Sequence, residues 1–194
     1  MGLTLDDAAQ QRLLEYLALL VQWNAAYNLT AVRDPLQMID RHLIDALSLA
    51  PYLATTELAD IGTGPGIPGM VLALVQPYER VWLVDSNGKK IRFLRECLRR
   101  FDLPHVHAKE SRAEALPGNQ PFPQIVSRAY SSLTDFVTST RQLLGNDGRW
   151  LAMKGKRPDD EIAALPAWAK VEHIDRLNVP GAEGERHLVV LRLV

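Results

Sequence analysis

The hydrophobic positions of the first third of the chain recur at helical spacing. We expect a first amphipathic helix there, with Thr4 and Asp7 as a capping pair. A second helix should begin with Asp34 as its N-cap and Pro35 in its first position, and continue to about residue 50. The apolar residues that define these helices are Leu13, Leu14, Leu17, Leu20 and Val21 in the first and Ile39, Leu43 and Leu47 in the second. Residues 1–55 are therefore predicted to form a helical extension packed on the core of the protein.

From Glu57 onward, short apolar runs alternate with helical stretches, which is typical of a parallel sheet with crossover helices. The last two extended runs are instead joined by the short segment "GAEGE", which predicts an antiparallel hairpin at the sheet edge. We expect strands at 58–61, 80–85, 106–109, 124–129, 148–154, 171–180 and 186–194, and helices from about 68, over 89–101 and over 133–144. Residues 56–194 should thus form an α/β domain.

Composition narrows the class of protein. The chain has 194 residues, of which 47% are hydrophobic and 23% charged, as in an ordinary globular domain. The single cysteine, Cys97, excludes an internal disulfide and a cysteine-built metal site, and the five histidines are scattered, so no metal is expected. The aliphatic run Met70 to Val75 is too short to span a membrane, and the acidic start of the chain lacks the basic region of a secretory signal. We expect a cytoplasmic protein.

Charge is distributed unevenly along the chain. Residues 1–60 hold three Lys or Arg against eight Asp or Glu, a charge of −5, whereas the remainder carries +4. The basic residues are concentrated in "GKKIRFLRECLRR" and "KGKRP". This distribution permits a polyanionic partner without requiring one.

A glycine-rich turn follows the first predicted strand, in "ADIGTGPGIPGMVLAL". Glycines at the carboxyl end of a strand let a ligand approach the bare backbone, and open α/β sheets bind ligands at that edge. The second strand ends at Asp85, 21 residues after Gly64, where a carboxylate could accept hydrogen bonds from both ribose hydroxyls of an adenosine. This spacing fits a nicotinamide dehydrogenase and an S-adenosylmethionine-dependent methyltransferase equally well.

Three features favour the methyltransferase. No tyrosine has a lysine four positions later, so the catalytic pair of a short-chain dehydrogenase is missing. Asp60, next to the loop, suits a cofactor with a cationic amino-acid end better than a pyrophosphate. By analogy of fold, a terminal antiparallel hairpin is also usual in methyltransferase sheets. A nicotinamide-dependent oxidoreductase and a non-catalytic RNA-binding α/β domain remain as alternatives.

Several motifs together resemble one family. They are "WNAAYNLTAVRDP", "RHLIDAL", "DIGTGPGIPG", "VDSNGKKIRFL", "SRAEAL", "VSRAY" and "GERHLVV", and they span nearly the whole chain. The sequence closely resembles the bacterial 16S rRNA guanine-N7 methyltransferases once called glucose-inhibited division protein B. The resemblance implies a Rossmann-like class I methyltransferase sheet and transfer of a methyl group from S-adenosylmethionine to guanine N7 of 16S rRNA. It also implies 16S rRNA or the small ribosomal subunit as partner, and we expect a monomer that uses neither a membrane nor a metal.

The same resemblance implies roles for individual residues. The methionine end of the cofactor would contact the glycine loop, the ribose would be held by the acid that ends the second strand, and the adenine would lie against the turn after the third strand. The implied cofactor-binding residues are Gly62, Gly64, Ile67, Asp85, Ala113, Glu114 and Arg128. One departure is Ala115, where relatives often carry a second acid.

RNA contacts are expected where basic residues follow the second and fifth strands. The candidates are Lys89, Lys90, Lys154, Lys156 and Arg157. Guanine N7 carries a neutral lone pair, so its methylation needs no catalytic base, and we expect catalysis by positioning alone. Asp60, Tyr130 and Trp23 are candidates to contact the purine, and His42 and Asp45 are expected to pair on one helix face without taking part in chemistry.

Overall fold

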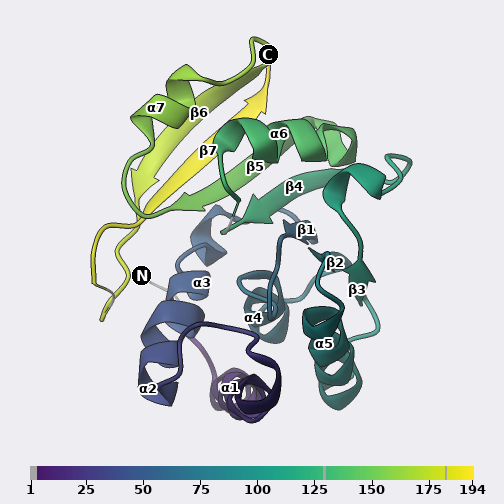
Figure 1. Ribbon diagram of the computed structural model, residues 1–194, viewed down its shortest axis with the longest axis vertical. Helices are drawn as coiled ribbons and strands as arrows, with labels where there is room; N and C mark the ends of the chain where they lie inside the picture. Colours follow the sequence, from purple (N-terminus) through teal and green to yellow (C-terminus); the bar gives the residue numbers. More distant parts are fainter. Residues whose placement is uncertain (1–3, 129, 182) are drawn as a thin grey trace.

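A seven-stranded sheet forms the centre of the molecule (Figure 1). The computed structural model describes residues 4–128, 130–181 and 183–194. Its strand order is β3-β2-β1-β4-β5-β7-β6; β1 to β5 run parallel, and β7 is antiparallel to both β5 and β6. The strands are β1 Glu57–Ile61, β2 Arg80–Asp85, β3 Val106–Glu110, β4 Phe122–Ser127, β5 Leu144–Lys154, β6 Ala169–Arg176 and β7 His187–Leu193. The expected parallel sheet with a C-terminal antiparallel hairpin is confirmed.

The side of the sheet on which new strands are added changes at β1. The chain adds β2 and β3 on one side of β1 and then crosses to its other side to form β4. Such a switch point leaves a crevice outside the carboxyl ends of the strands, because the connection after β1 leads to one side of the sheet and the connection after β4 leads to the other. The glycine-rich turn after β1 and the last residue of β2 both lie at this edge.

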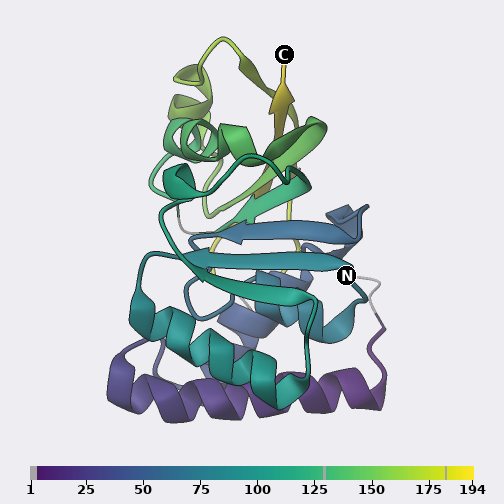
Figure 2. The same ribbon diagram turned by 90° about the vertical axis from the view of Figure 1, so that its right-hand side faces the viewer.

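Both faces of the sheet are buried, which explains why its central strands read as nearly continuous apolar runs. Successive residues of β2 alternate between two cores: Val81 and Leu83 pack in one, Trp82 and Val84 in the other. Helices α4 (Gly69–Val75) and α5 (Gly88–Phe101) cover the first face, and α6 (Leu133–Thr140) and α7 (Asp159–Ala163) lie on the second. In Figure 2, α1 (Asp7–Tyr27) lies beyond α5, on the side away from the sheet.

The N-terminal segment departs from the prediction in two details. The N-cap of α1 is Asp6, whose carboxylate accepts a hydrogen bond from the Ala9 amide at 2.7 Å, so the expected capping pair of Thr4 and Asp7 is wrong. Asp34 does cap the second helix. That helix is not continuous, however, and consists of α2 (Pro35–Met38), a π-helix η1 (Ile39–Ile44) and α3 (Asp45–Leu47), followed by a 3-10 turn η2 (Ala50–Tyr52).

The C-terminal half differs mainly at element boundaries. The helix expected over 133–144 ends at Thr140 and continues as a 3-10 turn, η4 (Arg141–Leu143), so β5 begins earlier than predicted. Thr140 also accepts a hydrogen bond from the buried Trp150 indole at 2.8 Å, which fixes α6 against β5. The expected strand end at position 129 lies outside the described residues. Within those residues, no helix is long and apolar enough to cross a bilayer.

Candidate functional site

The glycine-rich turn bends back over the end of β2. The Gly62 and Thr63 amides both donate to the Val84 carbonyl at 2.9 Å, which joins the turn to the neighbouring strand. Gly62, Gly64 and Gly66 have φ values of +71°, +62° and +104°, a region that side chains disfavour. The repeated glycines are thus required first by the path of the backbone.

Asp60 stabilises this turn through hydrogen bonds to its side chain. Its side chain is completely buried, and Oδ2 accepts hydrogen bonds from the Thr63 hydroxyl at 2.6 Å and from the Gly69 amide at 2.7 Å. Burial raises the pKa of Asp60 to about 6, although the hydrogen bonds from Thr63 and Gly69 oppose the shift. The expectation that Asp60 could contact the purine is wrong, because no part of its side chain reaches the surface.

Asp85 connects the turn to the second strand. Its Oδ2 accepts hydrogen bonds from the Gly64 amide at 2.9 Å and from Lys90 Nζ at 3.4 Å, and its Oδ1 accepts one from the Asn87 amide at 2.8 Å. Helix α5 is capped by Asn87, which accepts from the Lys89 amide at 3.0 Å. Asp85 is therefore oriented by the turn and is not itself the helix cap.

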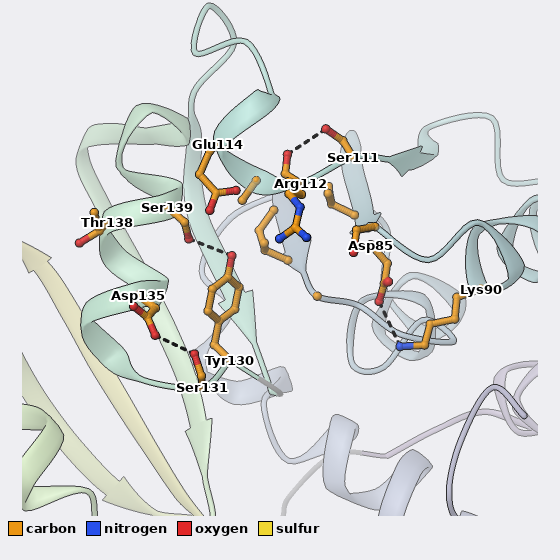
Figure 3. Close-up of a pocket in the computed structure, with 15 residues that line it drawn as sticks. Asp85, Lys90, Ser111, Arg112, Glu114, Tyr130, Ser131, Asp135, Thr138 and Ser139 are labelled. Atoms are coloured by element: carbon orange, nitrogen blue, oxygen red, sulfur yellow. Dashed lines mark hydrogen bonds and ion pairs between the residues drawn. The ribbon is translucent and has the colours of Figure 1, made fainter.

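Asp85 lines a cavity of about 630 Å³ at the carboxyl ends of β1, β2 and β4. Figure 3 shows Asp85 and Lys90 on one side of it and Tyr130 and Asp135 on the other, with Glu114 above them. The volume falls within the usual range for small-molecule sites. Among the charged lining residues, the acids Asp85, Glu114 and Asp135 outnumber the bases Lys90 and Arg112 by one.

Tyr130 forms the wall opposite Asp85. Its hydroxyl lies 2.8 Å from Ser139 Oγ, and its ring packs on Phe136 with centroids 5.2 Å apart. A Cβ added to Gly62 would stand 3.9 Å from the Tyr130 ring, so the ring faces the glycine turn across ordinary contact distance. Burial raises the pKa of Tyr130, and its hydroxyl is therefore neutral near pH 7. The ring offers a flat apolar surface and not a base.

Most residues implied for the cofactor meet in this cavity. Gly62, Asp85, Ala113 and Glu114 line it together. Gly64 contributes through its hydrogen bond to Asp85. The other two lie elsewhere: Ile67 is buried in the core beneath the turn, and Arg128 lines a neighbouring cavity. Their roles toward a cofactor stay predictions.

A second cavity, of about 440 Å³, lies beside the first and contains a cluster of charged side chains around the buried Asp45. Arg128 donates to the Arg41 carbonyl at 2.9 Å and approaches Asp45 at 3.4 Å, and Arg186 donates to Asp45 at 3.1 Å. The expected pairing of His42 with Asp45 is wrong, because His42 Nε2 lies 3.0 Å from Thr30 Oγ1 instead. Sequence reasoning missed Arg186, which is separated from Asp45 by 141 positions.

The basic residues predicted to contact RNA differ in their exposure and in whether a carboxylate pairs with them. Lys89 and Lys156 are exposed, whereas Lys90 pairs with Asp85. Lys154 is only 14% exposed and pairs with Glu161 at 2.8 Å, and the exposed Arg157 pairs with Asp159 at 2.7 Å.

Trp23, a candidate purine contact, packs against Tyr27 and Phe93 and does not line either cavity. In the part of the chain that the structure describes, no three His, Cys, Asp or Glu residues are grouped as metal ligands.

The chain is similar over nearly its full length to proteins named ribosomal RNA small subunit methyltransferase G. It is 53% identical to that of Marinobacter nauticus, over 98% of this chain and 89% of the relative. It is 51% identical to that of Pseudomonas aeruginosa, over 99% and 90%. The relative from Cronobacter sakazakii is 47% identical over 98% and 92%.

Solved structures support the fold assignment. TrmN from Thermus thermophilus superposes with a TM-score of 0.62 at 20% identity, over 77% of this chain and 48% of that one. A ribosomal protein L11 methylase from Lactobacillus delbrueckii subsp. bulgaricus gives 0.60 at 15% identity, over 77% and 76%. The family model GidB, described as rRNA small subunit methyltransferase G, matches residues 9–189. On this match and on the identity to its relatives, the chain belongs to the GidB family of methyltransferases.

Proposed function

We propose that the protein transfers a methyl group from S-adenosylmethionine to N7 of a guanine in 16S rRNA. The observation that carries the proposal is the Asp85 carboxylate, held by the glycine turn at the end of β2 and facing a cavity of about 630 Å³ in a chain of this family. The name of the family supplies the small-subunit rRNA, and the resemblance described above supplies the guanine and its N7 atom.

The cavity fits such a cofactor. A carboxylate offers about four acceptor positions, and Asp85 receives three donors, of which Lys90 at 3.4 Å is the longest. A ribose hydroxyl can occupy the remaining position or displace Lys90. Ala113 and Glu114 line the same cavity, where the adenine is expected. The excess of one carboxylate suits a ligand whose sulfonium gives it a net positive charge.

When bound, S-adenosylmethionine supplies an electrophilic methyl carbon: the N7 lone pair forms the new bond to it, and the electron pair of the breaking carbon–sulfur bond stays on sulfur. Guanine N7 has no proton to lose, so the chain needs no general base. Its residues have to fix the two reactants in line and exclude water, and such alignment can contribute roughly 7 to 11 kcal/mol. Tyr130, neutral and facing the glycine turn, is placed to stack against one of the reactants.

Family membership favours methyl transfer over the two alternatives, a nicotinamide-dependent oxidoreductase and a non-catalytic RNA-binding domain. The proposal also includes a monomer that acts in the cytoplasm on 16S rRNA or on the small ribosomal subunit.

The direct experiment is transfer of labelled methyl from S-adenosylmethionine to small ribosomal subunits from cells that lack this enzyme, followed by identification of the modified base. Label at N7 of one guanine supports the cofactor, the reaction and the substrate together. A preparation that binds the cofactor but labels neither subunits nor naked rRNA would overturn the assigned substrate. Label on another atom or base would overturn the guanine N7 assignment and leave the cofactor assignment standing.

A further inference from the structure

The second cavity is formed by four segments that lie far apart in the chain. Arg41, His42 and Asp45 come from the irregular helix of the N-terminal segment. Arg128 directly follows β4, Lys154 ends β5, and Arg186 directly precedes β7. It adjoins the first cavity, because Lys154 Nζ lies 3.5 Å from the carbonyl of Tyr130, whose side chain lines the first cavity. A ligand in each cavity would therefore approach the other near Tyr130.

The two cavities have opposite charge. The second is lined by the cations Arg41, Arg128 and Arg186 and by two carboxylates, Asp45 and Glu183; Lys154 also lines it, but its charge is paired with Glu161 at 2.8 Å. Glu183 is 92% exposed and lies 3.7 Å from Arg41, so water screens most of that pair. The first cavity has one carboxylate more than it has cations. The second cavity therefore favours an anion, and the first does not.

Asp45 holds two of these cations in place. Its side chain is only 5% exposed, and its two oxygens take different arginines: Oδ1 accepts from Arg186 Nε at 3.1 Å, and Oδ2 lies 3.4 Å from Arg128 Nη1. Each arginine side chain remains about one quarter exposed, at 26% for Arg186 and 27% for Arg128. A single buried carboxylate thus orients two partly exposed arginine side chains that line one cavity.

The element that carries Arg41 and His42 is a π-helix, in which the Asp45 amide donates to the Asp40 carbonyl five residues back. Short π segments inside helices occur frequently at functional sites. His42 is 3% exposed, and burial, assisted by Arg128, lowers its pKa to about 4. The imidazole is neutral near pH 7, so it adds an uncharged wall to the cavity and does not repel the arginines.

We propose that the second cavity is the acceptor subsite, in which Arg186 and Arg41 bind the phosphate of the target nucleotide in RNA and Asp45 acts as the positioning residue for Arg186 and Arg128. The inference rests on the proposed function and adds to it the place where the nucleotide binds. Its base would extend toward Tyr130, with N7 directed at the first cavity. Arginine suits this role because its planar donors match phosphate oxygens, and charge-assisted hydrogen bonds are stronger than neutral ones.

The test uses Arg186→Gln, with Arg149→Gln as its control. Arg149 lies on β5 and pairs with Glu172 at 2.7 Å, so the control removes the same charge and breaks a similar ion pair without touching either cavity. Three quantities are measured for each variant: affinity for a fluorescent 16S rRNA fragment by anisotropy, affinity for S-adenosylmethionine by calorimetry, and KM for small subunits. Arg186→Gln should weaken RNA binding and raise this KM about tenfold, with cofactor affinity changed less than twofold. Arg149→Gln should leave all three near wild type.

Asp45→Asn tests the positioning role separately. The amide keeps the shape of the side chain but loses the charge that orients both arginines, so KM for subunits should rise while kcat at saturating subunits changes little. A purely structural role would instead lower the melting temperature and reduce RNA binding and cofactor binding together. Asp45→Glu should restore part of the RNA affinity, because it restores the charge.

Two results would overturn the inference: RNA affinity of Arg186→Gln equal to that of Arg149→Gln, or an equal loss of RNA and cofactor affinity. The anisotropy measurement requires no turnover. If the wild type transfers no methyl group but Arg186→Gln still loses RNA affinity, the proposed reaction fails and the RNA subsite stands.

Discussion

The amide of Gly64 donates a hydrogen bond of 2.9 Å to the carboxylate of Asp85, although 21 positions separate the two residues. The turn after β1 and the end of β2 are therefore a single unit, in which the proposed ribose acceptor is oriented by the loop beside it. A substitution at either residue should therefore alter the position of the other.

Replacement of Asp85 tests this unit. Asp85→Ala removes the acceptor of the Gly64 amide as well as the charge, and should weaken S-adenosylmethionine binding and methyl transfer together. Asp85→Asn retains an oxygen for the Gly64 amide and should bind the cofactor better than the alanine variant but worse than wild type. Calorimetric titration of both variants, after circular dichroism has shown that they fold, makes the comparison. A folded Asp85→Ala protein with wild-type cofactor affinity would exclude the ribose-binding role.

Two glycines of the same turn should respond very differently to alanine. Both have positive φ, but a Cβ at Gly64 would meet only Lys90 Nζ at 4.0 Å, whereas a Cβ at Gly66 would lie 2.5 Å from Met70 Cβ and 2.8 Å from Leu94 Cδ2. Gly64→Ala should thus cost only the backbone strain, about 1 to 2 kcal/mol of unfolding free energy. Gly66→Ala adds overpacking and should cost about 3 kcal/mol or more. Urea denaturation measures both, and equal losses would contradict the predicted difference in packing.

The sheet and the first cavity were predictable because their signals are local. A strand that ends at Asp85 and a glycine turn after Ile61 are visible as short runs of sequence, and the parallel topology places their ends at one edge. The second cavity gave no such signal. Asp45 is partnered by Arg128 and Arg186 across 83 and 141 positions, and no periodicity reports such a contact. The π-helix was missed for a related reason, since one extra residue in a turn barely changes an apolar pattern.

Lys154, which ends β5, and the exposed Lys156 should contribute differently to RNA binding. Lys156 is exposed, whereas Lys154 pairs with Glu161, which also accepts the Leu133 amide at 2.7 Å. Lys156→Ala should reduce the slope of log affinity against log salt by about one while leaving stability unchanged. Lys154→Ala should leave cofactor affinity intact and lower thermal stability, because Glu161 loses its partner. Anisotropy over a salt series, with melting curves for both variants, separates the two effects. If Lys154→Ala decreased the salt slope and Lys156→Ala did not, the assignment would be reversed.

His42 should make the protein sensitive to mild acid. Its pKa in the folded protein is lowered to about 4 from an ordinary value of 6.5, chiefly by burial, so below pH 6.5 the unfolded chain binds a proton that the folded one does not. Its stabilising contribution is present above pH 6.5 and is lost as the pH falls toward 4, in total about 3 kcal/mol at 1.36 kcal/mol for each pKa unit.

Asp60 acts in the opposite direction. Its pKa is raised to about 6, so the folded state binds the extra proton and is stabilised as the pH falls through 6 toward 4. The contribution of His42 must therefore be measured as a difference. Unfolding free energies of wild type and His42→Gln, determined between pH 7 and 4, should converge as the pH falls. Parallel curves would mean that the His42 pKa is not lowered by folding.

Tyr16 connects the N-terminal segment to the glycine turn. It lies on α1, is fully buried, and donates a hydrogen bond of 2.8 Å to the carbonyl of Pro65. Burial raises the pKa of Tyr16, so the hydroxyl keeps its proton and acts as a donor. Tyr16→Phe leaves the buried Pro65 carbonyl without this partner and should cost about 1 to 3 kcal/mol of unfolding free energy. Because Pro65 follows Gly64 directly, cofactor affinity should fall as well.

Tyr78→Phe is the matched control, since it removes a tyrosine hydroxyl that is bonded to Gln76 at 3.0 Å and does not line the first cavity. If Tyr16→Phe alone weakens S-adenosylmethionine binding in calorimetric titration, α1 acts as a support for the turn and not only as a cover of the sheet. The N-terminal segment would then be necessary for the shape of the cofactor site, although none of its described residues, 4–55, lines the first cavity. If both variants lose stability and neither loses cofactor affinity, the hydrogen bond to Pro65 serves the fold alone.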